Sequence, residues 1–442
     1  MLLGVLWMCR WPMVALPQQL SNETSLHVSK GSVPHITLLA SGGGQRAAVG
    51  LMGSLYQMEK DGLLDSLLYL GGVSGSTWSM SSIYDDPQWS TSMDKAVSRL
   101  SGPGVKLEDA LAWLGERAKE EHFSLSDIWG VLTSAGIMKQ MNKRHLSDEA
   151  SRNATNPYPI YNAIEKHCFS HGKWFEVSPH EAGFTDLGFF IETSLLGSKF
   201  ENGELLEKKP EMDMIKLQGQ NQTELSKHMV SAATVSCPEC CTNRPMGTSF
   251  KKSLYCFLMF FPPVSLLTKK VLPKIMTWEW GTTRNFLFQY QDSVVPTCLQ
   301  SHERFHLIDA GLMINAPYPS FLGEKRDIDL IIAPEYSAGT MFEVCACACV
   351  GLNDRILQER DWPKDCYVFE GKENEASIVY MPLFNRRNCK GLSHTYFSTF
   401  QGPFSQEKME FVMETAKANM KNNKETLLEQ IHKAVLHRQR KS

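Results

Sequence analysis

A serine stands in the glycine-flanked pentapeptide GVSGS at 72–76, directly after the apolar run 67–70 and before a segment able to form a helix. A strand that turns sharply into a helix lifts one side chain out of the backbone, and only small flanking residues tolerate that turn. Ser74 is therefore the candidate nucleophile. Four of the five positions of the hydrolase pattern GxSxG are met, because Ser76 replaces the last glycine.

A second glycine turn, SGGGQRA at 41–47, follows the strand-like run 35–40 and opens the helical stretch 47–60. Successive glycines at a helix start expose backbone N–H groups to an approaching anion, which suits a phosphate or a developing oxyanion. A dinucleotide site would need GxGxxG and an acidic residue about 20 positions later. Because this loop reads GGGQRA and precedes Ser74 by thirty positions, we predict an oxyanion loop.

A third element is Asp309, which ends the strand-like run 305–308 and is followed by Ala-Gly. An aspartate at a strand end is most often a turn former, so it gains weight only beside the other two motifs. A carboxylate with a pKa of about 4 is a weak base for a serine hydroxyl, but burial would raise its proton affinity. In the chain order of the α/β-hydrolases, His394 is the rival base, since His432 and His437 lie in a charged terminal helix.

Five further segments carry a family resemblance: 70–78 (LGGVSGSTW), 156–160 (NPYPI), 174–176 (WFE), 197–200 (GSKF) and 278–283 (WEWGTT). In these segments the chain resembles the group IV cytosolic phospholipases A2, and within them the calcium-independent gamma type. The resemblance extends from about His35 to the last helix. It implies an α/β fold, a central mixed sheet flanked by helices, in a patatin/cytosolic phospholipase A2-like catalytic domain with a nucleophile elbow, no cofactor and no metal ligands.

The resemblance also implies roles for individual residues. A serine and an aspartate work as a dyad without histidine, which makes Ser74 the nucleophile and Asp309 its base. The oxyanion glycines and the two active-site arginines fall on Gly43, Gly44, Arg46 and Arg326. The planar fork of Arg46 beside the glycine loop could hold a substrate phosphate, whereas Arg326 lies in what is by composition an ordinary charged turn. The N–H of Gly75 is a further oxyanion donor.

Composition limits the remaining possibilities. The chain has 442 residues, a net charge of −3 and 43% hydrophobic residues, so it can bury a large core, and nucleic acid is excluded as the expected partner. Ser74 and Asp309 must meet in one site, which argues against a domain boundary between them. We predict one catalytic domain over 33–442 with an inserted lid or cap region at about 203–277, and a divergent N-terminal segment 1–32 outside the core.

The cysteines and the N-terminus predict different cellular compartments. A CxxC at 237–240 lacks a second pair at matching spacing, so zinc is not expected. A chain of this size needs no disulfides, and scattered cysteines suit a reducing compartment. The apolar start 1–9 and sequons at Asn22, Asn153 and Asn221 would suit a secreted protein, but no basic region precedes the apolar run.

Membrane contact is the last open question. No run reaches the roughly 18 apolar residues that span a bilayer. The segment 253–267, bracketed by lysine pairs, fits either the headgroup region or the core. Only 34 residues precede the first strand, too few for a C2 domain, and the chain ends without a prenylation box. We expect 405–441 to form a helix that packs on the domain, with Leu427, Leu428, Ile431 and Val435 on one face.

Together with the serine, glycine and aspartate motifs, the family resemblance implies a calcium-independent phospholipase A2 and lysophospholipase that acts on the sn-2 ester of glycerophospholipids through an acyl-serine. Transfer of the acyl group to a lysophospholipid would be a second activity of the same residues. The expected location is the cytoplasm, with peripheral association to intracellular membranes. Two alternatives remain: a catalytically silent membrane-binding relative, and a carboxylesterase assisted by His394 that acts on soluble esters.

Overall fold

A computed structural model describes residues 33–120, 123–220, 281–322, 326–337, 358–359, 361–372, 375–389, 397 and 404–441. Several sequence features lie outside these residues. They are the N-terminal segment 1–32, most of the predicted lid, the apolar segment 253–267, the CxxC at 237–240 and His394.

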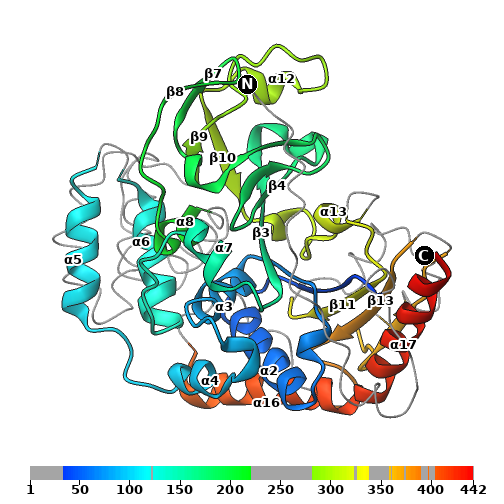
Figure 1. The fold of residues 1–442 in the computed structure, drawn as a ribbon. Helices are drawn as coiled ribbons and strands as arrows, with labels where there is room; N and C mark the ends of the chain where they lie inside the picture. Colours follow the sequence, from blue (N-terminus) through cyan, green and yellow to red (C-terminus); the bar gives the residue numbers. More distant parts are fainter. Residues whose placement is uncertain are drawn as a thin grey trace.

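A mixed sheet forms the centre of the fold, with helices beside and below it (Figure 1). Its main path runs β12-β13-β11-β1-β2-β3-β4-β5-β6, and β10 pairs with β3 and β9. The five strands β13, β11, β1, β2 and β3 are parallel neighbours, and the outer pairs are antiparallel. The predicted fold class, a central mixed sheet flanked by helices, is therefore confirmed.

The strands of this sheet and of a separate hairpin (β7–β8) are β1 (Ile36–Ala40), β2 (Tyr69–Val73), β3 (Tyr158–Glu165), β4 (Trp174–Val177), β5 (Glu181–Phe184), β6 (Phe189–Glu192), β7 (Lys199–Glu201), β8 (Glu204–Glu207), β9 (Thr282–Arg284), β10 (Arg304–Ile308), β11 (Leu330–Glu335), β12 (Tyr367–Phe369) and β13 (Ser377–Pro382). The parallel strands β1, β2 and β11 are buried throughout. Burial on both faces is why their sequences read as apolar runs rather than alternating ones.

Two long helices cover the sheet beside the predicted site. Helix α2 (Gln45–Lys60) begins directly after the glycine turn and packs along α16 (Gln406–Asn422), as Figure 1 shows. The contact is close at Gly53, where a methyl group would lie 2.6 Å from the Met413 carbonyl oxygen. The nucleophile candidate precedes α3 (Gly75–Ile83), which packs on α2.

The C-terminal stretch is helical, as predicted, but forms two helices rather than one. Helix α16 ends at Asn422, and α17 (Lys424–Lys441) begins after the junction residue Asn423. Helix α17 packs on β11 and β13 with Leu427, Ile431 and Val435 buried. The other described helices are α4 (Asp94–Leu100), α5 (Leu107–Arg117), α6 (Leu125–Val131), a π-helix (Leu132–Ile137), α7 (Glu149–Arg152), α8 (Met214–Gln220), α12 (Thr297–Gln300) and α13 (Tyr318–Phe321).

The topology explains how residues 74 and 309 come together. Strand β2 pairs with β3 as far as Asn162, and the antiparallel β10 pairs with β3 from Ile164. Because β4 holds the other edge of β3, β2 and β10 share one edge and approach each other end to end. Ser74 follows the end of β2 and Asp309 follows the end of β10. Both residues therefore lie at the junction between the two strands.

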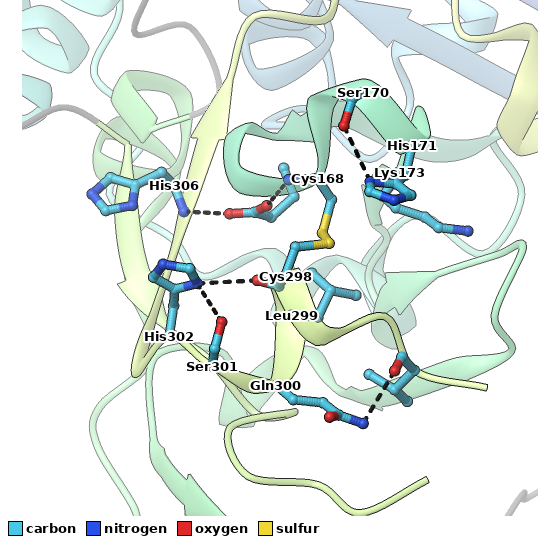
Figure 2. The surroundings of a disulfide bond; sticks show 12 residues. Cys168, Ser170, His171, Lys173, Cys298, Leu299, Gln300, Ser301, His302 and His306 are labelled. Atoms are coloured by element: carbon cyan, nitrogen blue, oxygen red, sulfur yellow. Dashed lines mark hydrogen bonds between the residues drawn. A yellow bond between two sulfur atoms is a disulfide. The ribbon is translucent and has the colours of Figure 1, made fainter. Parts of the chain in front are cut away.

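A disulfide joins Cys168 to Cys298, with the two Cα atoms 5.6 Å apart (Figure 2). Cys168 lies in the 3₁₀ segment η5 (Lys166–His171) just after β3, and Cys298 lies in α12 ahead of β10. A chain of this size was expected to need no disulfide, and the sequence did not predict this pair. The two cysteines are 130 positions apart, and only the antiparallel pairing of β3 with β10 brings them together. Within the described residues, Cys366 and Cys389 are not part of a disulfide bond.

Two structural features bear on glycosylation and on membrane crossing. The sequon residue Asn153 is 6% exposed, and its side-chain amide donates to the Tyr84 carbonyl at 3.0 Å. A buried, hydrogen-bonded asparagine is not accessible for glycosylation. In the part of the chain that the structure describes, no helix has the length and apolar character to cross a bilayer.

Candidate active site

The nucleophile candidate Ser74 forms the turn between β2 and α3 and is 3% exposed. Its backbone has φ 53° and ψ −133°, a conformation that residues with a side chain rarely adopt. A methyl group on the next residue, Gly75, would collide with the carbonyl oxygen of Gly44, so the turn also requires glycine there. A strained serine in a strand-to-helix turn has the geometry of a nucleophile elbow.

Ser76, which replaces the last glycine of the hydrolase pattern, has a structural use. Its hydroxyl oxygen accepts the N–H of Val73 at 3.0 Å and donates to the carbonyl of the same residue at 2.7 Å. The carbonyl of Ala40, in the neighbouring strand β1, lies 3.2 Å away. These hydrogen bonds of the Ser76 side chain connect the end of β2 to the start of α3. The pentapeptide alone gave no signal for this contact.

Asp309 follows β10 and is 2% exposed. Burial raises the pKa of its carboxyl to about 6, although a hydrogen bond from the Ser74 side chain and the N–H of Gly311 both act in the opposite direction. Oδ1 accepts the Gly311 N–H at 2.8 Å. Oδ2 is buried and lacks a partner of good geometry within the described residues. The structure thus places a serine hydroxyl beside a buried carboxyl with a raised pKa and an acceptor atom available, which suits a general base.

The glycine loop lies against the elbow. Gly44 caps α2 with φ 60° and ψ −136°, nearly the conformation of Ser74 in the adjacent turn. A methyl group on Gly42 would lie 2.9 Å from Cβ of Ser74, and one on Gly43 would lie 2.7 Å from the Tyr336 carbonyl oxygen. Helices α2 and α3 therefore begin side by side at the serine. Their first N–H groups have no intrahelical acceptors, and both positive helix ends would stabilise an oxyanion.

Arg46 is fully buried in the first turn of α2. Its Nε donates to the Tyr336 carbonyl and its Nη1 to the Phe397 carbonyl. Burial lowers the pKa of the guanidinium to about 10, an effect that the charge of Glu335 partly opposes, so the group stays charged at neutral pH. Its Nη2 would lie 3.2 Å from a methyl group on Gly43. The guanidinium thus lies under the glycine loop, and the contacts described here are to protein carbonyls.

Arg326 is placed away from the dyad. Its guanidinium pairs with Glu176 of β4, which is 1% exposed, and lies 5.9 Å from the ring centroid of Tyr69 at the start of β2. Burial disfavours the charged guanidinium, but the Glu176 carboxylate outweighs this effect and raises its pKa. None of its described contacts is to Ser74 or Asp309. The structure therefore does not bring Arg326 together with the other residues that the resemblance implies.

Of the histidines beyond Asp309 in the chain, the structure describes His432 and His437. His432 and His437 lie in α17, and Nδ1 of His437 is 3.6 Å from the carboxyl of Asp329, which precedes β11. Asp329 is at the amino end of that parallel strand, whereas Ser74 follows the carboxyl end of β2. His394 lies outside the described residues. Among the residues described, no group of three or more His, Cys, Asp or Glu side chains is arranged to hold a metal ion.

The sequence is similar to known lipases over most of its length. Residues 36–99 and 114–226 match the family described as the lysophospholipase catalytic domain. Human cytosolic phospholipase A2 gamma is 27% identical, over 92% of this chain and 90% of its own length. Human cytosolic phospholipase A2 zeta is 30% identical, over 84% of this chain and 51% of its own length. The chain therefore spans most of the gamma protein and about half of the zeta protein.

The fold is shared with a solved relative. The structure of human GIVD cytosolic phospholipase A2 superposes with a TM-score of 0.74 at 22% identity, covering 96% of this chain and 66% of that chain. The same mixed α/β architecture thus accompanies the sequence similarity to the gamma and zeta proteins. In sequence the chain is therefore similar to the group IV cytosolic phospholipases A2.

Proposed function

We propose that this protein is a calcium-independent phospholipase A2 and lysophospholipase that cleaves the sn-2 acyl ester through Ser74 and Asp309. The observation that carries this proposal is the pairing of a strained elbow serine with a buried carboxyl whose pKa is about 6. The family and the names of the relatives support a phospholipid ester as the substrate. Glycerophospholipids and lysophospholipids are the proposed substrates.

In the first half-reaction Asp309 accepts the proton of the Ser74 hydroxyl as its oxygen attacks the ester carbonyl carbon. The carbonyl electron pair moves onto oxygen, and the N–H groups of Gly43, Gly44 and Gly75 bind that oxyanion. The intermediate collapses by breaking the bond to the glycerol oxygen, which takes the proton from Asp309 and leaves as lysophospholipid. Ser74 now carries the acyl group.

In the second half-reaction a water molecule gives its proton to Asp309 and attacks the acyl-serine. Collapse of this intermediate returns the proton to the serine oxygen and releases the fatty acid. A lysophospholipid hydroxyl that replaces the water would receive the acyl group instead. We therefore include transacylation as a second activity of the same residues.

Arg46 is proposed to act through the glycine loop. The described contacts of its guanidinium tie the loop to the carbonyls of Tyr336 and Phe397, and hold Gly43 against the first of them. This favours a bracing role over direct binding of the substrate phosphate. No catalytic role is proposed for Arg326, because its contacts are with Glu176 and neighbouring rings.

The proposed location is the cytoplasmic face of intracellular membranes, in line with the names of the relatives. Cytosolic reductants keep most thiols reduced. We therefore expect Cys168 and Cys298 to be present in the cell as two reduced thiols. Rapid alkylation of cell extracts followed by mass spectrometry reads this state directly. A pair found oxidised in the cell would contradict the proposed compartment.

The function is tested by release of labelled fatty acid from sn-2-labelled phosphatidylcholine vesicles with excess calcium chelator. Ser74→Ala and Asp309→Asn should each abolish release, while Ser81→Ala, which alters a buried serine of the same helix, should not. Human GIVD cytosolic phospholipase A2 has been solved with a methyl gamma-linolenyl fluorophosphonate. The same compound can titrate Ser74 here. Release that persists in Ser74→Ala would remove Ser74 from the reaction.

A further inference from the structure

Asn315 joins the glycine loop to the loop that carries Asp309. It lies between the 3₁₀ turn η10 (Ala310–Leu312) and α13. Its backbone carbonyl accepts the N–H of Gly42 at 2.8 Å, and its side-chain Nδ2 lies 3.5 Å from the carbonyl oxygen of the same glycine. Asn315 therefore contacts both the backbone N–H and the backbone carbonyl of Gly42, across a sequence separation of 273.

The carboxamide also lies beside both members of the dyad. A methyl group built on Gly42 would collide with Oδ1 of Asn315 and would lie 2.9 Å from Cβ of Ser74. A methyl group built on Gly311 would lie 2.8 Å from the same Oδ1 and 3.1 Å from Oδ1 of Asp309. The carboxamide oxygen of Asn315 therefore lies close to Ser74 on the side of Gly42 and close to the Asp309 carboxyl on the side of Gly311.

We propose that Asn315 is a positioning residue of the catalytic centre. Its carboxamide holds the oxyanion loop in register with Ser74 and Asp309, and it keeps a neutral group next to the carboxyl that must accept a proton. This inference rests on the proposed function and adds a residue that neither the glycine motifs nor the family resemblance had indicated.

Replacement by alanine removes the carboxamide but keeps the backbone bond to Gly42. Because small displacements of reacting groups are costly, we expect Asn315→Ala to lower kcat by about 10- to 100-fold. The KM should stay within about twofold, since the carboxamide is not assigned a part in holding the lipid. The rate of Ser74 labelling by the fluorophosphonate should fall together with kcat.

Replacement by aspartate keeps the shape and adds a charge beside Asp309. A like charge at this distance disfavours the ionised carboxyl. We expect the acidic limb of the kcat/KM profile of Asn315→Asp to move upward by about one pH unit. A residue that only supported folding would leave this limb in place.

The control is Asn388→Asp, which changes a partly buried loop asparagine that bonds the Leu383 carbonyl beyond β13. It should leave kcat and the pH profile unchanged. Thermal unfolding of every variant separates loss of the fold from loss of chemistry.

Each result supports or overturns the inference. A fall in kcat with a folded Asn315→Ala protein and a shifted limb in Asn315→Asp support it. Suppose that Ser74→Ala abolishes hydrolysis and Asn315→Ala stays within twofold of wild type. This result overturns the role of Asn315 and leaves the proposed function standing. Hydrolysis that survives Ser74→Ala overturns the proposed function and this inference together.

Discussion

Ser74 shows how function and stability oppose each other in a single residue. Its positive φ costs roughly 1–3 kcal/mol because the side chain crowds the backbone. Glycine adopts the same conformation without that crowding. We expect Ser74→Gly to abolish hydrolysis and to raise the midpoint of thermal unfolding above that of Ser74→Ala, as measured by calorimetry on the same preparation.

The matched comparison is Gln289→Gly, because Gln289 is an exposed residue with φ 56° outside the site. It should raise the midpoint without changing hydrolysis. An unfolding midpoint for Ser74→Gly at or below that of Ser74→Ala would show that the serine backbone is not strained.

Asp309 gives a pH dependence with a definite sign. In the proposed mechanism hydrolysis requires the ionised carboxyl, so kcat/KM should fall as the pH is lowered through about 6. Stability should change in the opposite direction. Because burial raises the pKa from 3.8 to about 6, the favourable contribution of the protonated carboxyl is complete below pH 4 and is lost as the pH rises through 6. Ionisation of Asp309 at pH 7 thus lowers the free energy of unfolding by about 3 kcal/mol.

The variant Asp309→Asn isolates this cost. It should be inactive and up to about 3 kcal/mol more stable than wild type at pH 7, with the advantage shrinking below pH 6 and absent near pH 4. Denaturant unfolding at a series of pH values measures the difference. An advantage that is equal at pH 4 and pH 7 would rule out the buried, ionised carboxyl as its source.

At the scale of whole elements, the sequence predicted best the strands and helices whose residue pattern lies within one continuous segment. The apolar runs 35–40 and 305–308 became β1 and β10 within one residue, and the helix expected at 47–60 begins at Gln45. The run 67–70 was less accurate, since β2 occupies Tyr69–Val73. Its two glycines are strand residues, packed against Phe321 and Met80, and glycine carries no apolar signal.

Features that depend on partners far along the chain could not be predicted. The carbonyls that Arg46 meets belong to residues 336 and 397, and the carboxylate that Arg326 meets belongs to Glu176. An arginine beside a motif looks the same in a sequence whether it faces substrate or protein. The proximity of Ser74 and Asp309 could be predicted because the family resemblance supplied the pairing of these two residues.

The ion pair between Arg326 and Glu176 of β4 should stabilise the folded protein without contributing to catalysis. Loss of one partner leaves a buried charge uncompensated, which costs about 3–5 kcal/mol. We expect Arg326→Met to lower the unfolding midpoint sharply, and the double variant with Glu176→Gln to recover part of the loss. The kcat per active site, titrated with the fluorophosphonate, should stay unchanged in both. A reduced kcat per titrated site would restore Arg326 to the catalytic residues.

For the molecule as a whole, the Cys168–Cys298 bond links two distant parts of the chain. A crosslink over 130 residues restricts the unfolded chain and is expected to contribute about 2–4 kcal/mol. Cys298→Ser should therefore lower the unfolding midpoint of the oxidised protein. It should leave kcat unchanged, because Cys298 precedes β10 and Asp309 follows the other end of that strand.

Reducing agent provides the internal check, since reduced wild type should unfold at the midpoint of Cys298→Ser. Cys366→Ser, which alters a partly buried free thiol, should behave like oxidised wild type. A midpoint for oxidised wild type that does not respond to reducing agent would mean that the bond adds nothing to stability.

The end-to-end meeting of β2 and β10 on one edge of β3 also has a consequence for biosynthesis. The nascent chain contains the proposed nucleophile once residue 74 is made, but the proposed base is translated 235 residues later, which takes roughly ten to fifty seconds. During that time the ribosome-bound chain holds an elbow serine with no partner to accept its proton. In the proposed mechanism, ester cleavage therefore begins only after residue 309 has been made, and a product terminated before that residue would lack the base.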